Sequence, residues 1–175
     1  EQYLIRKFGY DVGGRIHLGR SSGDLIAVAR RVVVRDLLIR TMNGVLELRA
    51  ALLPVVHEAA DAVMPGYTHG MHAQPTTMGA QLLSWVARLE RDFERLAGSY
   101  RHTNQSPAGA AIMTGAPFPI NRDSTSRYLG FDCVMYNTFD AIVGGTDYSL
   151  EAYGAVAILN GHLGRWADDI SLWFS

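Results

Sequence analysis

The sequence predicts an all-α fold in which long helices pack as a bundle. Three segments carry apolar residues at spacings of three and four, the period of one helix face, and they begin near Asp24, Leu82 and Asn137. No segment of useful length alternates apolar and polar residues as a half-buried strand does. Helices this long carry more apolar surface than one chain of 175 residues can cover, which favours a bundle completed by oligomerisation.

The composition fits one domain with a sizeable core. Hydrophobic residues make up 48% of the chain, and 16 basic side chains nearly balance 17 acidic ones. This balance argues against a nucleic-acid partner and a membrane surface, and no apolar run reaches the ~20 residues of a membrane-spanning helix. The single cysteine, Cys133, excludes an intrachain disulfide and fits a reducing, cytoplasmic location.

Both ends of the sequence have the pattern of interrupted helices. Residues 1–8 look like the last turns of a helix, and the pattern near Trp173 stops without a glycine cap. We therefore expect the chain to be part of a longer polypeptide.

The first long helix is expected from Asp24 to about Asp61. Ser21, Ser22 and Asp24 offer oxygen acceptors at its start, where backbone N–H groups lack partners. Pro54 is expected to bend or interrupt it. At ~1.5 Å per residue this helix would be roughly 55 Å long.

Residues 64–77 are expected to form a loop between the first two long helices. Pro65 and Pro75 remove backbone donors, and Gly66 permits a positive φ. Polar groups gather in this segment at Thr68, His69, His72 and Gln74. A loop held between rigid helices is a usual place for a polar site; helix capping and solvated histidines are the alternative interpretation.

The second long helix is expected over Leu82–Tyr100, and its charged residues 88–95 have the pattern of a solvated or partner-facing surface. Residues 104–123 are rich in small residues and proline, which indicates an ordered connection. Ser124 is expected to cap a short helix that follows.

The last long helix is expected from Asn137 or Thr138 to Trp173, with a kink or bulge at Gly144 and Gly145. His162 lies within this helical pattern and is interpreted, like the other histidines in helical segments, as a surface or core residue.

Four motifs resemble, in the same order, signature regions of argininosuccinate lyases. They are Gly13–Ser21 with Asp24, Met64–His69 with Ala73–Pro75, Asn104–Gly109, and Phe118–Arg122. That family belongs to the fumarase/aspartase superfamily, whose members are homotetramers built round a central helical bundle. By this resemblance, residues 1–23 end an N-terminal region with the first substrate-binding signature, and residues 24–175 belong to the central helical-bundle domain.

The resemblance implies a C–N lyase that eliminates arginine or another amine from an N-succinyl compound and releases fumarate, without a cofactor. A base removes the proton next to a carboxylate, and an acid protonates the leaving nitrogen. By resemblance His69 is the general acid and Thr68 a donor to the substrate carboxylate. The residues in the substrate-binding regions are Ser21, Ser22, Asp24 and Gln74. The family's base is a serine on a loop near Gly-Ser-Ser and Met-Pro-x-Lys, expected beyond Ser175.

Two departures from the family's motifs bear on which amine the substrate carries. The first region usually contains Ser-Arg-Asn-Asp-Gln, whereas residues 21–25 here, Ser-Ser-Gly-Asp-Leu, lack the arginine and the asparagine that contact substrate. Near the last helix, residues 143–147 replace Ser-Asp-Arg-Asp with a segment one residue longer. Argininosuccinate and another N-succinyl amine, such as ethylenediamine-disuccinate, both remain candidate substrates. A non-catalytic structural paralogue, like the lens crystallins of this family, is the alternative.

The expected helix length also predicts how the sites assemble. The Gly19–Asp24 cluster precedes the first long helix and the Thr68-His69 segment follows it. A helix of roughly 55 Å would keep the two clusters apart within one subunit, so we expect a homotetramer whose active sites are shared between subunits.

Overall fold

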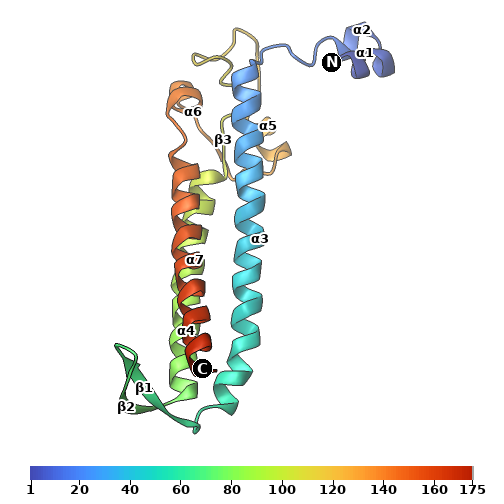
Figure 1. The fold of residues 1–175 in the computed structure, drawn as a ribbon. Coiled ribbons are helices and arrows are strands. Elements are labelled where there is room, and N and C mark those ends of the chain that lie inside the picture. Colours follow the sequence, from blue (N-terminus) through green and yellow to red (C-terminus); the bar gives the residue numbers. More distant parts are fainter. Residues whose placement is uncertain (175) are drawn as a thin grey trace. The chain divides into compact units, whose positions relative to one another are not determined.

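Helices make up most of the structure, a computed structural model that describes residues 1–174, and the predicted all-α, long-helix class is confirmed (Figure 1). The long helices are α3 (Ser22–Glu58), α4 (Met78–Thr103) and α7 (Asp147–Trp173). The short helices are α1 (Gln2–Phe8), α2 (Tyr10–Gly13), α5 (Arg122–Tyr128) and α6 (Thr138–Val143). Short strands form two two-stranded sheets, β1 (Val63–Thr68) with β2 (Met71–Thr77), and β3 (Gln105–Ser106) with β4 (Cys133–Val134).

The chain divides into two compact units. The first contains residues 1–35 and 101–147, and the second contains residues 36–100 and the chain from residue 148 onward. In the residues that the structure describes, no helix combines the length and the apolar character needed to cross a membrane.

Helix α3 begins with a reciprocal pair of hydrogen bonds between Ser21 and Asp24. The Asp24 backbone N–H donates to Ser21 Oγ at 3.2 Å, and the Ser21 backbone N–H donates to Asp24 Oδ1 at 3.1 Å. This is the capping-box arrangement, which satisfies donors that the first helical turn leaves free. Pro54 lies inside the helix and does not interrupt it, since α3 continues to Glu58.

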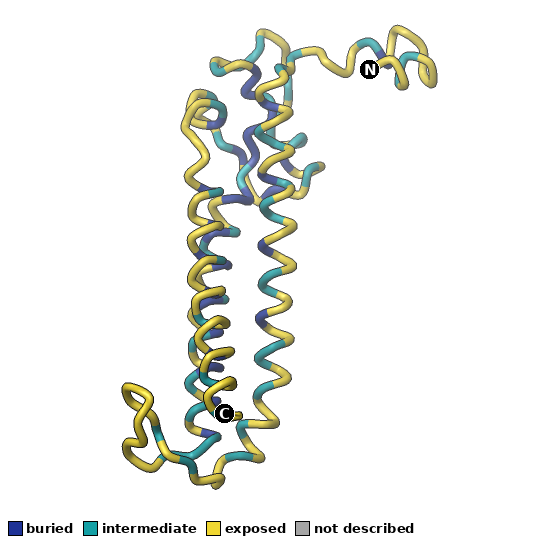
Figure 2. Tube along the Cα trace, in the orientation of Figure 1, coloured by how far each residue is buried: buried dark blue, intermediate teal, exposed yellow. Residues whose placement is uncertain are grey.

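In the second unit, α4 and α7 pack through apolar residues at helical spacing. Leu82, Trp85, Val86, Leu89 and Leu96 are buried on α4, and buried positions recur along both helices (Figure 2). The Trp85 ring stacks on Trp166 with centroids 4.9 Å apart, and on Trp173 at 5.6 Å. The predicted 3–4 spacing therefore marks the packed face of α4. On α7 it does so only in part, since Leu159 and Trp166 are buried whereas Leu163 and Ile170, at the same spacing, are exposed.

The prediction of a loop at residues 64–77 is wrong, because these residues form the β1–β2 hairpin. Its strands pair Pro65 with Pro75, so two residues without N–H groups share one position of the ladder, and the register shifts between Pro65 and Tyr67. The two turn residues, His69 (φ 54°) and Gly70 (φ 74°), both have positive φ, as a type I′ hairpin turn requires. Prolines usually argue against strands, and His-Gly is a less familiar hairpin signal than Asn-Gly.

Two other boundaries differ from the prediction. Helix α5 is capped by Asn121 and not by Ser124: the Asn121 Oδ1 atom accepts the Ser124 N–H at 2.8 Å. The last predicted helix is two helices, because the chain leaves helical geometry between Val143 and Asp147, where Gly145 has φ 109°. A positive φ of this kind is readily adopted only by glycine, so the Gly-Gly pair ends one helix where the sequence predicts a kink or bulge.

Candidate active site

The β1–β2 hairpin presents two of the predicted site residues at its tip. Thr68 is the last residue of β1, and His69 is the first residue of the turn. Both side chains are exposed, and neither hydrogen-bonds to another described residue. Histidine tolerates the left-handed backbone region better than most non-glycine residues, so the turn can hold a hydroxyl and an imidazole side by side, both available to a ligand.

Strand β2 carries the other two polar residues of this segment. His72 pairs with Tyr67 across the hairpin, and their rings meet edge to face with centroids 5.2 Å apart. This contact stiffens the hairpin next to its turn, since cross-strand aromatic pairs stabilise a two-stranded ladder. Gln74 is exposed further along β2. The structure thus places Thr68, His69 and Gln74 on one hairpin.

The first unit holds the other predicted residues at the start of α3. Asp24 is 1% exposed, and its Oδ2 atom accepts the Ala111 N–H at 3.2 Å. Ser21 Oγ donates to the Ala111 carbonyl at 2.7 Å. Both side chains therefore hold Ala111, which has φ 54°, in addition to capping the helix. Ser22, the first residue of α3, is exposed.

A cavity of about 430 Å³ lies beside this helix start. Its wall includes Leu18, Arg20, Asp24, Ala108, Gly109 and Ile120, so the motifs of the first unit converge on it. Gly109 has φ 77°, and a Cβ at this position would lie 2.9 Å from the Arg122 Cγ atom. The close approach of the Ala108–Gly109 backbone to Arg122 therefore requires glycine.

Arg122 ties two of the motifs to the rest of the first unit. Its guanidinium donates to the Ala108 carbonyl at 2.9 Å, to the Met135 carbonyl at 2.7 Å and to the Tyr136 carbonyl at 3.3 Å. Burial lowers the pKa of Arg122, partly offset by the nearby Asp123 carboxylate. With its donors directed at backbone carbonyls, this arginine shapes the cavity wall.

Arg35 is a structural residue that the sequence did not single out. Its Nη1 atom donates to Asn104 Oδ1 at 2.9 Å and to the Gly130 carbonyl at 2.7 Å, and its guanidinium lies 4.8 Å from the centre of the Phe131 ring. Asn104 belongs to the third motif and is fully buried. The apolar periodicity of α3 gives no signal for Arg35, because its partners lie about 70 to 95 residues away.

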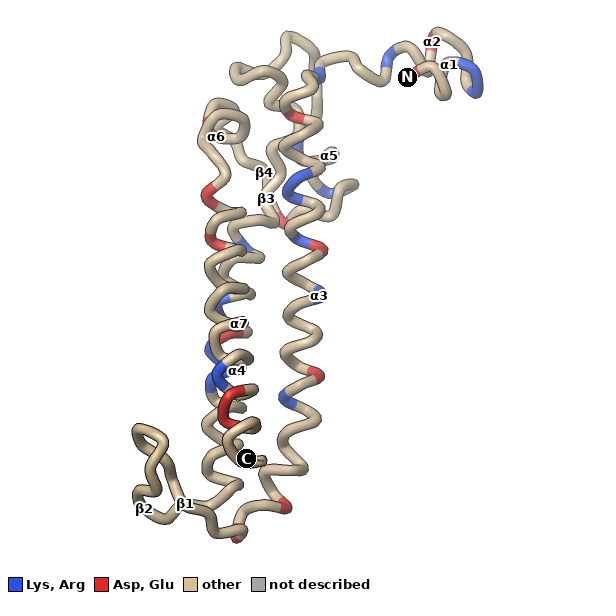
Figure 3. Tube along the Cα trace, viewed as in Figure 1, with Lys and Arg blue, Asp and Glu red and all other residues tan. Residues whose placement is uncertain are grey.

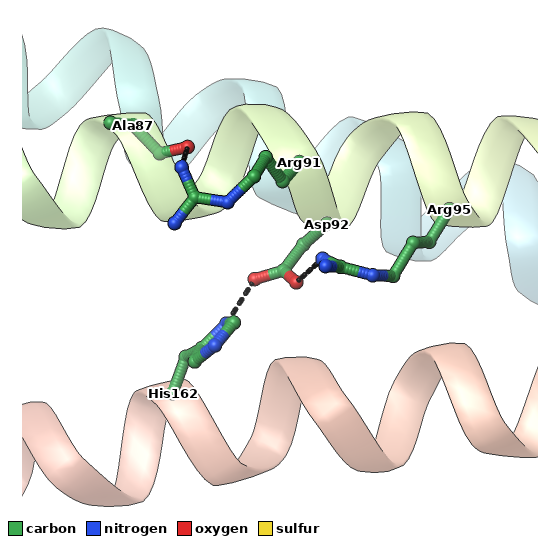
Figure 4. Close-up of polar contacts among 5 residues, drawn as sticks. All are labelled: Ala87, Arg91, Asp92, Arg95 and His162. Carbon is green, nitrogen blue, oxygen red and sulfur yellow. Dashed lines mark hydrogen bonds and ion pairs between the residues drawn. The ribbon is translucent and has the colours of Figure 1, made fainter.

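The interpretation of residues 88–95 as a solvated charged surface is wrong for Asp92. This carboxylate is fully buried, and its Oδ2 atom lies 2.7 Å from His162 Nδ1 on α7 (Figure 4). Arg95 donates to the other oxygen at 3.0 Å. Asp92 lies three residues after Leu89 and four before Leu96, so its position belongs to the buried face of α4. The spacing therefore predicts burial at this position, whereas an aspartate in a run of charged residues predicts exposure.

Metal-ligating groups do not cluster in the part of the chain that the structure describes: no three His, Cys, Asp or Glu side chains there could hold one ion together. The polar groups available at the hairpin tip are a hydroxyl and an imidazole, which can donate hydrogen bonds and transfer a proton.

Known proteins resemble the chain along its whole length. A family model described as lyase matches residues 3–175. The argininosuccinate lyase of Methanocorpusculum labreanum is 42% identical over 173 residues, which cover 99% of this chain and 35% of the relative. That of Laribacter hongkongensis is 40% identical over 175 residues, covering 100% and 38%. A crystal structure of EDDS lyase in complex with formate superposes with a TM-score of 0.93 at 35% identity, covering 99% of this chain and 35% of that one. The chain thus spans little more than a third of the length of these relatives.

Proposed function

Because the chain belongs to the lyase family whose model matches residues 3–175, we propose that the protein is a carbon–nitrogen lyase that eliminates an amine from an N-succinyl compound and releases fumarate. The observation that carries the proposal is the hairpin tip, where the side chains of Thr68 and His69 are exposed and make no hydrogen bond to another described residue. Two relatives that match this stretch of chain, those of Methanocorpusculum labreanum and Laribacter hongkongensis, are argininosuccinate lyases.

The proposed reaction needs an acid, a base and donors for a developing negative charge. A base takes the proton from the carbon next to a carboxylate, the electron pair forms the double bond, and the carbon–nitrogen bond breaks. We assign His69 as the acid that protonates the leaving nitrogen, and Thr68 as a donor to a substrate carboxylate oxygen. Gln74, Ser21, Ser22 and Asp24 belong to the substrate-binding regions, Asp24 and Ser21 through the backbone that they hold. The base is assigned to a segment outside the described residues.

We also propose that the active sites form between subunits of a homotetramer. The 37 residues of α3 form one uninterrupted helix, which is about 55 Å long at 1.5 Å per residue. Large apolar side chains stay exposed on the long helices at Ile26, Val33, Leu37, Leu53, Leu150 and Ile170. Such side chains need covering by partner helices, and a tetramer with shared sites would cover them and bring the two clusters of different subunits to one substrate.

The identity of the amine that is eliminated is a further part of the proposal. Argininosuccinate as substrate would place the protein in arginine biosynthesis, in the cytoplasm. Ethylenediamine-disuccinate is the second candidate, favoured because Ser22 and Gly23 stand where argininosuccinate lyases have arginine and asparagine. The likeness to EDDS lyase at 35% identity supports this alternative as well. A non-catalytic paralogue would release fumarate from neither compound.

The experiment is a fumarate assay on the full-length protein, with each of the two compounds as substrate and ultraviolet absorbance as the readout. We expect turnover of one compound, and in His69→Asn the loss of most of kcat, since the proton donor is removed while a residue that tolerates positive φ is kept. His57→Asn is the matched control, because His57 is an exposed histidine in the last turn of α3. Near-wild-type kcat in His69→Asn would refute the assignment of the acid, and no fumarate from either compound would refute the proposed reaction.

A further inference from the structure

A second, polar pocket lies in the second unit, between the hairpin and the helices α4 and α7. Its volume is about 240 Å³. The hairpin contributes residues 64–67 and Thr76, α4 contributes Gln81 and Arg88, and α7 contributes Arg165 and Asp169. His69 and Thr68, the residues of the proposed chemistry, do not line it.

The pocket has more positive than negative charge. Arg88 is half-buried and makes no hydrogen bond or ion pair with any described residue. Arg165 pairs with Asp169 only at 3.8 Å, between Nε and Oδ1. Two arginines and one aspartate thus line the pocket, although charges of both signs are spread along α4 and α7 (Figure 3). By contrast, Arg35 and Arg122 direct their donors at carbonyl and amide oxygens of the protein.

The elements converge because each presents one face to the pocket. Gln81 and Arg88 are seven residues apart, two turns along one face of α4, and Arg165 and Asp169 are one turn apart on α7. On β1 the less exposed residues are Met64 and Gly66. Arginines from two helices therefore line a small space to which the hairpin also contributes residues. Their planar fork of donors matches the oxygens of a carboxylate or a phosphate.

We propose that this pocket binds a small oxyanion, with Arg88 and Arg165 as the charged donors and Gln81 as a neutral donor. The volume lies below the ~300–1,000 Å³ of sites for drug-sized ligands, so the ligand is a small carboxylate or phosphate. A bound anion would connect the base of the hairpin to α4 and α7. The site is separate from the proposed substrate site, and its occupancy would restrain the element that carries His69.

Tryptophan fluorescence can report binding, because Trp173 lines the pocket and stacks on Trp85. The full-length protein is titrated with succinate and, in a second series, with inorganic phosphate. We expect a saturable change in the wild-type protein, and a Kd at least about tenfold higher in Arg88→Met, since a charge-assisted pair is lost. Arg91→Met is the matched control: Arg91 is exposed on α4, donates to the Ala87 carbonyl and does not line the pocket.

Gln81→Glu is the second variant, because it keeps the size of the side chain and adds a negative charge to the pocket. It should weaken binding of the same anion, and it tests the proposal even if Arg88→Met fails to fold. The anion with the lower Kd identifies the ligand class. Thr68→Ala separates this pocket from the proposed substrate site: a fluorescence change lost in Thr68→Ala and retained in Arg88→Met would overturn the proposal. No saturable change with either anion in the wild-type protein would overturn it as well. So would a wild-type Kd in Arg88→Met or, if that variant does not fold, in Gln81→Glu.

Discussion

Replacing His162 by alanine should destabilise the protein more than replacing Arg95, although both side chains pair with Asp92. The Asp92 carboxylate has no exposed surface, whereas the side chains of His162 and Arg95 are 27% and 41% exposed. His162 Nδ1 lies 2.7 Å from one carboxylate oxygen, and Arg95 Nη1 lies 3.0 Å from the other. His162 also comes from α7, so this contact joins two helices, while Arg95 and Asp92 share α4.

The magnitudes follow from which group is left unpaired. Without His162 a buried carboxylate oxygen loses its partner, which costs about 3 kcal/mol, the low end for a broken buried pair, because water can enter the vacated space. Without Arg95 water can reach the other oxygen, and the cost is about 1 kcal/mol. In the Asp92→Asn background the buried charge is gone, and His162→Ala removes only a neutral hydrogen bond, worth about 1 kcal/mol. The expected coupling energy between the two positions is therefore about 2 kcal/mol.

The assay is urea unfolding of the full-length protein at one fixed concentration, so that any subunit association affects every variant equally. The wild type, Asp92→Asn, His162→Ala and the double variant form the cycle, and Arg95→Ala provides the comparison. If His162→Ala costs no more than Arg95→Ala, or if the cycle shows no coupling, the pair of Asp92 and His162 does not stabilise the contact between α4 and α7.

Three further predictions concern other parts of the chain. Ser21→Ala should cost about 2 kcal/mol in urea unfolding, because it removes the cap of α3 and the bond to the Ala111 carbonyl; a cost near zero would contradict the capping geometry. Gly79→Ala should cost about 2 kcal/mol or more by the same assay, since its Cβ would lie 2.8 to 3.0 Å from backbone atoms of residues 56–60, and wild-type stability would contradict that packing. A hydrogen bond to the Asp123 carboxylate raises the pKa of Tyr136 above 10.0. Because the folded pKa exceeds the unfolded one, the stability that this phenol contributes is complete below pH 10.0 and is lost as pH rises through the folded pKa; NMR titration of the Tyr136 ring should show the pKa falling towards 10.0 in Asp123→Ala, and an unchanged value would contradict the assignment.

Much of the fold could be predicted because a helix with a buried face carries apolar residues at spacings of three and four along its own sequence. The spacing of apolar residues located α3, α4 and α7, and the start of α3 was readable since the Ser21 and Asp24 partners lie within one turn. Resemblance in the motifs indicated the lyase family, which the match over residues 3–175 confirms. The roles of individual residues in substrate binding and catalysis stay predictions.

The hairpin conformation of residues 64–77 depends on cross-strand pairing that the residue types do not predict. Pro65 and Pro75 predict a loop when each is considered alone, yet they oppose each other in one ladder position of the hairpin. The positive φ of His69 follows from the hairpin turn and not from any preference strong enough to be read in the sequence. The sequence located the polar residues, and the strand pairing decided that Thr68 ends a strand and His69 begins an exposed turn.

Only the tertiary structure decided the partners of the buried polar groups. A helical period records which face of a helix is covered, because that constraint acts along one segment at a time. It carries no record of the atom that a buried side chain meets, since that atom belongs to an element far away in the sequence. Asp92 therefore resembled its solvated neighbours until α7 placed His162 against it, and Arg35 gained its role only when the chain near Asn104 and Gly130 packed around it.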